Sequence, residues 1–209
     1  MRKAFEYRLY PTKKQQQVLL WTLARCRELY NAALSEWKDA YQQYERTQLQ
    51  SNPETGQVIA ATMVTHKRVL TVSYYEQKRD LPEVKDIREE YQDIHSQVLQ
   101  DVLLRLKRAF DGFFRRIKQG QDPGYPRFQG RNRYDSFTYP DGAGWKLEGD
   151  RLDLTKIGSA KVKLHRPIEG KIKTVTIKRE VDQWYVTVRR FGACFDNSIG
   201  VEGREQIPF

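Results

Sequence analysis

Hydrophobic and polar side chains alternate in the first residues of the chain. Within residues 2–9, Phe5, Tyr7 and Leu9 fall on one side, while Glu6 and Arg8 fall on the other. Alternation with a period of two is the pattern of a β-strand that has one buried face. We therefore predict a strand over this segment, ended by the Pro-Thr pair that follows it.

A long amphipathic helix is predicted next. Thr12, with Gln15 three residues later, has the pattern of a capping box. Apolar side chains then recur at steps of three and four residues, which is the period of a helix with one buried face. They are Leu19, Leu23, Cys26, Tyr30, Ala33, Trp37, Tyr41 and Tyr44. Such a stripe is more typical of helix packing than of a ligand site, so we assign it to the core.

The pattern is weaker until a second strong helix. Residues 47–72 are compatible with a loop or a short helix, and residues 73–77 begin a helical patch before Leu81 and Pro82. From Asp93 to Lys118 the helical period returns, with Ile94, Val98, Val102, Leu106, Ala109, Phe113 and Ile117 on one face. The other face of this helix becomes basic toward its C-terminal end, where cations oppose the negative end of the helix dipole.

The chain changes to a β pattern after Gly120. Short alternating runs lie at residues 136–140, 145–147, 151–154, 160–165, 171–179 and 183–190. Six short, evenly spaced strands are typical of a small antiparallel barrel. The strand at 2–9 would complete it beside the last strand. We therefore predict an α+β fold with a first barrel strand (1–11), an inserted helical recognition domain (12–119), the rest of a wedge barrel (120–190) and a divergent tail (191–209).

Charge is concentrated in blocks. The 209 residues carry a net charge of +10. Residues 1–27, 101–133 and 151–190 are each strongly basic, whereas residues 80–101 hold seven acidic against two basic side chains. Several basic blocks around one acidic connector favour a polyanionic partner such as nucleic acid, although a charged run is also common on an ordinary solvated face.

Other function classes find little support. No run of 18 apolar residues and no signal peptide is present, so we expect a cytoplasmic protein without membrane association. The two cysteines and three histidines have no metal-ligand spacing, so we expect no metal and no cofactor.

Residues 124–139 (GYPRFQGRNRYDSFTY) interleave tyrosines and phenylalanines with three arginines. Guanidinium groups bind phosphates and stack on bases, and aromatic rings accept unpaired bases. The same stretch is equally compatible with a surface loop that enters a strand, its aromatic rings anchored in the core.

Four motifs together resemble the N-terminal half of the TnpB (OrfB) family of insertion-sequence proteins. They are residues 3–12 (KAFEYRLYPT), 27–31 (RELYN), 109–115 with its AF and FFR pairs, and 124–128 (GYPRF). The resemblance runs from residue 2 to about residue 190. It implies an RNA-guided DNA endonuclease family, in which a wedge barrel and recognition helices hold a guide RNA and read a short DNA motif beside the transposon end.

The resemblance also implies roles for individual residues. DNA reading would fall on Tyr74, Ser96, Gln97, Gln100, Phe137, Thr138 and Tyr139. Glutamine suits this role because its amide can pair with adenine in the major groove. Contacts to RNA or phosphate would fall on Lys3, Arg8, Arg127, Arg131, Arg133, Lys161, Lys163, Lys171 and Lys173. The glutamines could instead be ordinary exposed residues, Tyr74 and Phe137 core residues, and the lysines solvent-facing.

The C-terminal residues depart from the family pattern. The nuclease half would begin with an aspartate in an Ile-Gly-Val/Ile-Asp context, but here residues 198–201 (SIGV) precede Glu202, and no partner carboxylates form a set. Two-metal hydrolysis needs several acidic ligands that hold cations about 4 Å apart. We therefore expect no catalytic residue in this chain, as in a frameshifted or decayed reading frame. A separately encoded nuclease half is a partner that would supply the missing catalytic residues.

Three hypotheses follow from these patterns. The first is a truncated TnpB-like module that binds guide RNA and double-stranded DNA without nuclease activity of its own. The second is a DNA-binding repressor or transposition regulator. A dimeric state and a palindromic footprint on DNA would favour this hypothesis. The third is an enzyme completed in trans, or a transposase.

Overall fold

The computed structural model describes residues 2–49, 72–140, 142–168 and 170–191. Helices and strands follow one another as β1 (Arg2–Tyr10), α1 (Lys13–Leu49), α3 (Tyr74–Ile87), a 3-10 helix (Glu89–Asp93), α4 (Ser96–Lys118), β2 (Ser136–Tyr139), β3 (Trp145–Glu148), β4 (Arg151–Leu154), β5 (Gly158–Lys163), β6 (Lys171–Glu180) and β7 (Gln183–Phe191). The predicted divergent tail, apart from residue 191, and most of the ambiguous segment 47–72 lie outside the described residues.

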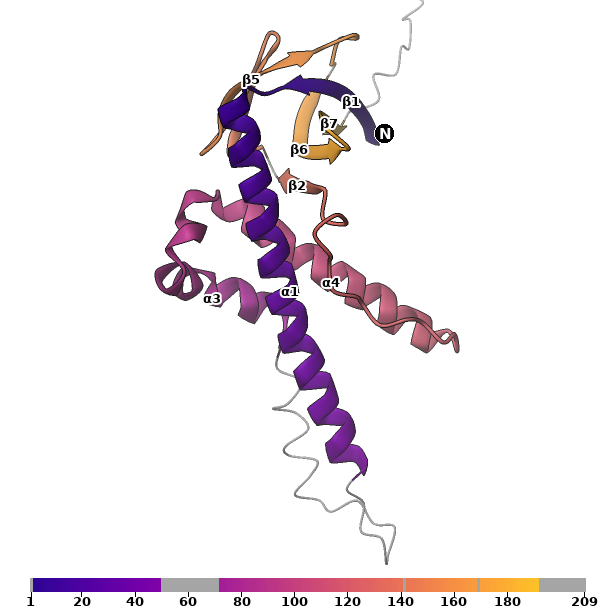
Figure 1. Ribbon diagram of the computed structural model, residues 1–209. Coiled ribbons are helices and arrows are strands. Elements are labelled where there is room, and N and C mark those ends of the chain that lie inside the picture. Colours follow the sequence, from indigo (N-terminus) through magenta and orange to yellow (C-terminus); the bar gives the residue numbers. More distant parts are fainter. Residues whose placement is uncertain (1, 50–71, 141, 169, 192–209) are drawn as a thin grey trace, which may run out of the picture.

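Seven strands form one antiparallel sheet in the order β2-β6-β7-β1-β5-β4-β3. The predicted place of the first strand is confirmed, because β1 pairs with β7 along eight residues. The sheet curls into a half-barrel above the helices (Figure 1). Its edges, in the described part of the chain, are β2 and β3, so the fold is α+β with an open, curled sheet in place of a closed barrel.

The helices follow β1 in the chain and precede the rest of the sheet, and they share one apolar core with it. Leu19, Cys26 and Leu34 of α1, together with Leu106 of α4 and Phe137 of β2, are all essentially inaccessible to solvent. Such continuity arises because the apolar stripe of α1 and the inner face of the sheet have no other surface to cover. The predicted stripe is thus confirmed as core from Leu19 to Ala33, with Trp37 partly buried against it, while the side chain of Tyr44 lies outside the described residues.

Caps mark where the helices begin. Gln15 N–H donates to Thr12 Oγ1 at 3.3 Å and Thr12 N–H donates to Gln15 Oε1 at 2.9 Å, so the predicted capping box is present. A second capping box joins Ser73 and Glu76 at the start of α3. These reciprocal bonds satisfy N–H groups that have no partner within the helix.

Two helix boundaries differ from the prediction. Helix α3 does not end before Leu81 but continues through Pro82 to Ile87. Pro82 is exposed, so the backbone carbonyl that it leaves unpaired can be hydrated and the cost of the interruption is reduced. Helix α4 begins at Ser96, after the 3-10 helix, and Ile117 in its last turn is 43% exposed instead of packed in the core.

Within the described residues, no helix combines the length and apolar character that crossing a membrane requires.

Candidate nucleic-acid interface

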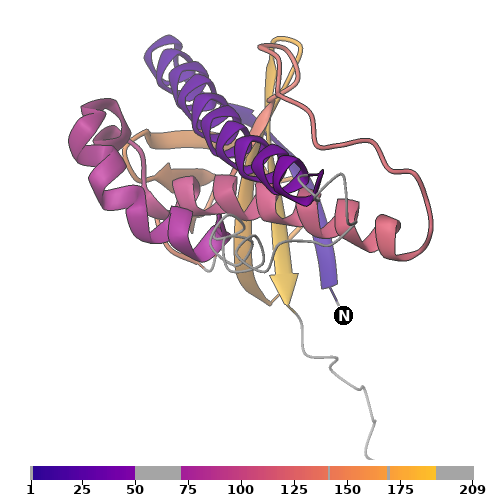
Figure 2. The same ribbon diagram turned by 90° about the horizontal axis from the view of Figure 1, so that it is seen from below.

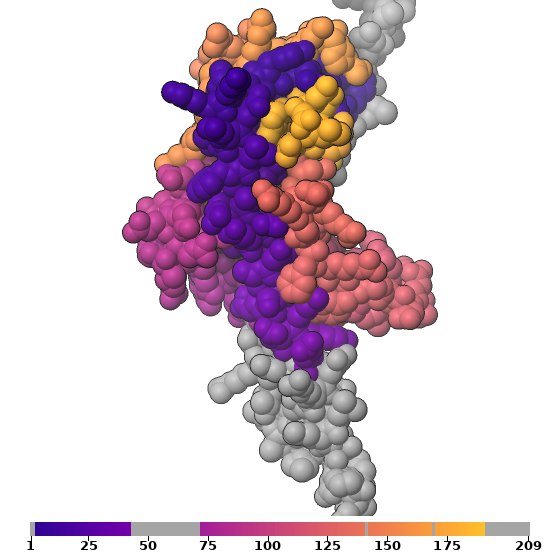
Figure 3. All heavy atoms as spheres, in the orientation of Figure 1, coloured from indigo at the N-terminus to yellow at the C-terminus, as the bar shows by residue number. Residues whose placement is uncertain are grey.

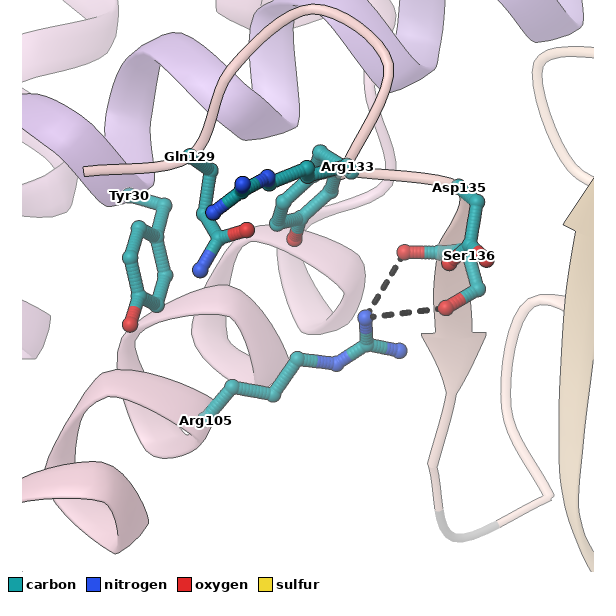
Figure 4. Close-up of a pocket in the computed structure, with 7 residues that line it drawn as sticks. Tyr30, Arg105, Gln129, Arg133, Asp135 and Ser136 are labelled. Carbon is teal, nitrogen blue, oxygen red and sulfur yellow. Dashed lines mark hydrogen bonds between the residues drawn. The ribbon is translucent and has the colours of Figure 1, made fainter. Parts of the chain in front are cut away.

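A pocket of about 230 Å³ lies where α1, α4 and the connection 119–135 meet the start of β2 (Figure 4). The connection runs from the far end of α4 back to the sheet, as Figure 2 shows. The pocket is lined by Tyr30, Arg105, Gln129, Arg133, Tyr134, Asp135 and Ser136. It therefore belongs to the arginine- and aromatic-rich stretch that the sequence singled out.

Asn31 fixes the connection to α1. Its Nδ2 donates to the carbonyl oxygen of Gln129 at 3.0 Å, and the backbone N–H of Gln129 donates to Asn31 Oδ1 at 2.8 Å. One side chain thus satisfies both backbone polar groups of Gln129, a residue that lies outside the sheet and the helices. Asn31 ends the RELYN motif, and the structure gives that motif a physical role.

Arg105 ties α4 to β2. Its Nε donates to Asp101 Oδ2 at 2.9 Å, Nη1 donates to the carbonyl oxygen of Ser136 at 2.7 Å, and Nη2 donates to Thr138 Oγ1 at 2.7 Å. Asp101 is only 6% exposed, so the guanidinium also compensates a buried carboxylate. Arg105 therefore joins an edge strand to the helix, and it is not a free cation of the basic helix face.

Neutral phenols form one wall of the pocket. Tyr134 is 9% exposed, and burial raises the pKa of its phenol far above the usual range. Its hydroxyl is buried without a hydrogen-bond partner among the described residues. Burial also raises the pKa of Tyr30. Both groups keep their protons at neutral pH, so the pocket presents hydrogen-bond donors to a polar or anionic guest.

The GYPRF motif divides between core and surface. Tyr125 packs against Phe110 and Phe113, with ring centroids 5.4 and 4.9 Å apart. Phe128 is 48% exposed, and Lys38 Nζ lies 4.2 Å from its ring centroid. Tyr125 thus anchors the connection, as the core interpretation of this stretch expected, while the cations on either side of Phe128 are exposed: Arg127, Arg131 and Arg133.

The polar residues expected to read DNA share the start of α4. Ser96 is exposed and accepts a hydrogen bond from Lys85 Nζ at 2.7 Å. Gln97 and Gln100 are half-buried and lie one helical turn apart, and the Oε1 of Gln97 is buried without a partner among the described residues. Tyr74 is half-buried at the N-terminal end of α3, whereas Lys85 lies in the last turn of that helix, roughly 16 Å away along its axis.

The three expected residues of β2 take different positions. Phe137 and Tyr139 are 0% and 2% exposed, and the Tyr139 hydroxyl donates to the carbonyl oxygen of Thr155 at 3.1 Å. Thr138 faces the other side of the strand, where its Oγ1 lies 2.9 Å from that of Thr176. The two rings belong to the core, so a base could stack on them only if the core opened.

Cations expected to bind phosphate lie in three places. The connection holds the three arginines named above. On the sheet, Arg8 lies directly opposite Lys163, and Lys161 lies opposite Tyr10. Lys3 lies opposite Arg190, and Lys171 lies opposite the last residue of β7. Lys173 stands at a register shift between Ile172 and Thr174, and it is exposed, as is Lys171.

The acidic connector is held against α1 by ion pairs. Arg25 contacts Glu28 at 2.9 Å and Glu90 at 3.6 Å, while Arg88 contacts Glu28 at 3.7 Å and Glu90 at 3.3 Å. Two basic residues of the chain are thus used internally. Glu90 of the 3-10 helix thus has a structural role that the sequence pattern did not indicate.

Sequence reasoning missed two tyrosines on the outer face of the sheet, the exposed Tyr10 and the partly buried Tyr185, and the bridging role of Asn31. The tyrosines stand at outward positions of otherwise ordinary strand patterns, so only the strand pairing reveals what lies beside them. No group of three or more potential metal ligands occurs in the described part of the chain.

Comparison with known proteins gives two matches. Residues 1–46 match the family HTH_OrfB_IS605, described as a helix-turn-helix domain. A protein of Escherichia coli (strain K12), "Putative RNA-guided DNA endonuclease InsQ", is 27% identical over 189 residues, which cover 90% of this chain and 40% of that protein. The chain thus spans less than half the length of this relative.

Residues 1–46 are matched as a helix-turn-helix, yet in the structure they hold strand β1 and most of the single helix α1. The relative, in contrast, is matched across helices and sheet alike. These two matches agree with the resemblance to the N-terminal half of the TnpB (OrfB) family: one covers residues 1–46, and the other extends over 90% of the chain.

Proposed function

We propose that this chain is a nucleic-acid-binding module that holds a guide RNA and contacts DNA beside the transposon end, without nuclease activity of its own. The observation that carries the proposal is the homology to a protein named for RNA-guided DNA cleavage, across 90% of the chain. The net charge of +10 and the exposed arginines of the connection 119–135 support it.

The two nucleic acids would use different chemistry. The amides of Gln97 and Gln100 would contact base edges of a duplex, while the exposed cations of the connection and the sheet would contact phosphates. The pocket beside Tyr134, with its buried hydroxyl, would receive a polar group of the bound strand. This division separates residues that set sequence preference from residues that set affinity.

The test is to purify the chain from cells that carry its own locus and to sequence the RNA bound to it. We expect an RNA from that locus, and filter binding should show an affinity that falls as salt is raised. The double variant Arg127→Gln/Arg131→Gln should reduce the slope of log affinity against log salt by about 1.4 for a single strand, since each phosphate contact contributes about 0.7.

The matched control is Lys78→Gln/Arg79→Gln, which removes two exposed cations from α3 beside the acidic connector. Its salt slope should equal that of the wild type. Absence of copurified locus RNA, together with salt-insensitive binding, would refute the proposal. Cleavage of a target duplex by the purified chain with its RNA would contradict the absence of nuclease activity.

A DNA-binding repressor or transposition regulator is the second candidate, favoured by the helix-turn-helix match of residues 1–46. A protein of that type binds as a dimer to half-sites about 34 Å apart. Sedimentation analysis and footprinting on the transposon ends distinguish the two. A dimer with a palindromic footprint supports the repressor, and a monomer that needs RNA to bind DNA supports the module.

A further inference from the structure

The outer face of the sheet carries a continuous row of basic and aromatic side chains. Strand register places Ser136, Lys178, Tyr185, Arg8 and Lys163 directly opposite one another across five strands. The neighbouring row consists of Tyr10, Lys161 and Arg151. No carboxylate occurs at these eight positions, so the two rows present cations and phenol rings side by side.

Arg8 stands between the two rings. Its guanidinium carbon lies 5.2 Å from the ring centroid of Tyr185 and 5.6 Å from that of Tyr10. Arg8 Nη1 donates to Tyr185 Oη at 3.2 Å, and Tyr185 Oη donates to Gln183 Oε1 at 2.8 Å. These contacts fix the Tyr185 ring in place, while Tyr10 is 50% exposed.

The fold itself does not require aromatic rings on this side. The opposite face of the same strands supplies the core, with Tyr7, Leu9, Val162, Trp184 and Val186 all buried. The atoms of β1 and β7 adjoin on the molecular surface near the N-terminal end of α1 (Figure 3). A solvated sheet face usually carries polar side chains, so the exposed Tyr10 and the partly buried Tyr185 beside an arginine call for another explanation.

Nearby carboxylates leave most of this charge uncompensated. Lys178 pairs with Glu180 at one side of the rows. Lys161 lies 3.6 Å from Asp150, but both side chains are highly exposed, and such pairs bind weakly. Among the described residues, Arg8, Lys163 and Arg151 have no ion-pair partner within 4.0 Å. A polyanion would find three cations here that no carboxylate of the described residues pairs with.

We propose that this face binds a single-stranded segment of the nucleic acid, with bases stacked on Tyr185 and Tyr10 and phosphates held by Arg8, Lys163, Lys161 and Arg151. The inference rests on the proposed function and names which part of the nucleic acid meets the sheet. Aromatic rings offer stacking surface to unpaired bases of any sequence, whereas the bases of a duplex are already stacked on one another.

The experiment compares binding of a 12-nucleotide single-stranded RNA and of a blunt DNA duplex by the full chain. We expect Tyr10→Ala/Tyr185→Ala to weaken single-strand binding at least tenfold and duplex binding less than threefold. Tyr10→Phe/Tyr185→Phe should stay within threefold of the wild type on both probes, because the stacking surface is kept. A single strand with 5-iodouridine should cross-link to Tyr10 or Tyr185.

Tyr75→Ala is the matched control, since this tyrosine is 74% exposed on α3, away from the sheet. A second variant, Lys161→Gln/Lys163→Gln, leaves both rings in place and should lower the single-strand salt slope by about 1.4. Equal losses on single strand and duplex overturn the inference, as does unchanged single-strand binding of the Ala variant while the wild type binds. Failure of the wild type to bind either probe refutes the proposed function itself.

Discussion

Arg8 and Arg105 show how neighbours decide what one guanidinium group does. Arg105 is surrounded by hydrogen-bond acceptors, among them the carboxylate of Asp101, which is only 6% exposed. Its N–H groups therefore form hydrogen bonds within the protein. Arg8 has two phenol rings beside it and no acid within 4.0 Å among the described residues. The first arginine stabilises the fold, and the charge of the second is not paired with any carboxylate of the described residues.

Cys26 provides a test at the residue scale. The thiol is fully buried, and burial raises its pKa from about 9 to about 12. In a Cys194→Ser background, a thiol reagent at pH 8 should react with the folded chain at least 100-fold more slowly than with the urea-unfolded chain, because reaction needs an exposed thiolate.

The same shift predicts a pH dependence of stability. An unfolded thiol loses its proton above pH 9, but the folded one keeps it, so the free energy of unfolding should fall as pH rises from about 9 to about 12. Cys26→Ala in the Cys194→Ser background should show a smaller fall, which urea titration at each pH would measure. Identical pH dependence in the two proteins would contradict the burial argument.

Helix α4 contacts both α1 and the edge strand β2. Its apolar face packs against α1, with the rings of Trp37 and Phe110 stacked 4.4 Å apart. Gln97 and Gln100 lie near its N-terminal end, and the side chain of Arg105 covers the edge strand β2. An uncovered edge strand invites pairing with another chain, so this contact also protects the sheet.

The joint between α4 and β2 can be tested by removing its charges. Arg105→Gln should lower the free energy of unfolding by about 3–5 kcal/mol, because Asp101 would remain buried and uncompensated. Arg105→Gln/Asp101→Asn should recover a large part of that loss in chemical denaturation. Lys107→Gln, which breaks an exposed pair with Asp111, is the control and should cost less than about 1 kcal/mol. A small effect of Arg105→Gln would show that the joint contributes little.

The whole molecule depends on its first strand. β1 lies between β7 and β5 in the middle of the sheet, although it is separated from them in sequence by all the helices. Without β1, the sheet would fall into two halves, β2-β6-β7 and β5-β4-β3. Strands β1 and β7, which are distant in sequence, therefore have to pair before the two halves of the sheet are joined.

We predict that a chain starting at residue 13 loses its cooperative thermal transition, followed by circular dichroism. A peptide of residues 1–12 added in trans should restore the transition, because it supplies the missing strand. The same peptide with Tyr7→Ser and Leu9→Ser should fail, since both side chains are 1% exposed in the core. A cooperative transition at the wild-type temperature without any peptide would refute this view of the fold.

Local pattern alone predicted many of the elements. Alternation located β1 and the six later strands, and helical spacing located α1 and α4, because each of these segments has one buried face with a clear period. The TnpB-like motifs were also readable without coordinates. Pattern failed where the period is weak, as in α3, whose proline is tolerated only because its surroundings are exposed.

The amino-acid sequence by itself thus determined the periodic elements, the blocks of charge and the family motifs, since these depend on residues close together in the chain. Only the tertiary structure decided which cations stay free, that the rings of Phe137 and Tyr139 are enclosed, and that Tyr185 stands opposite Arg8. Such facts depend on strand register and helix packing, which bring together residues that are distant in the chain, such as Arg8 and Tyr185, 177 positions apart.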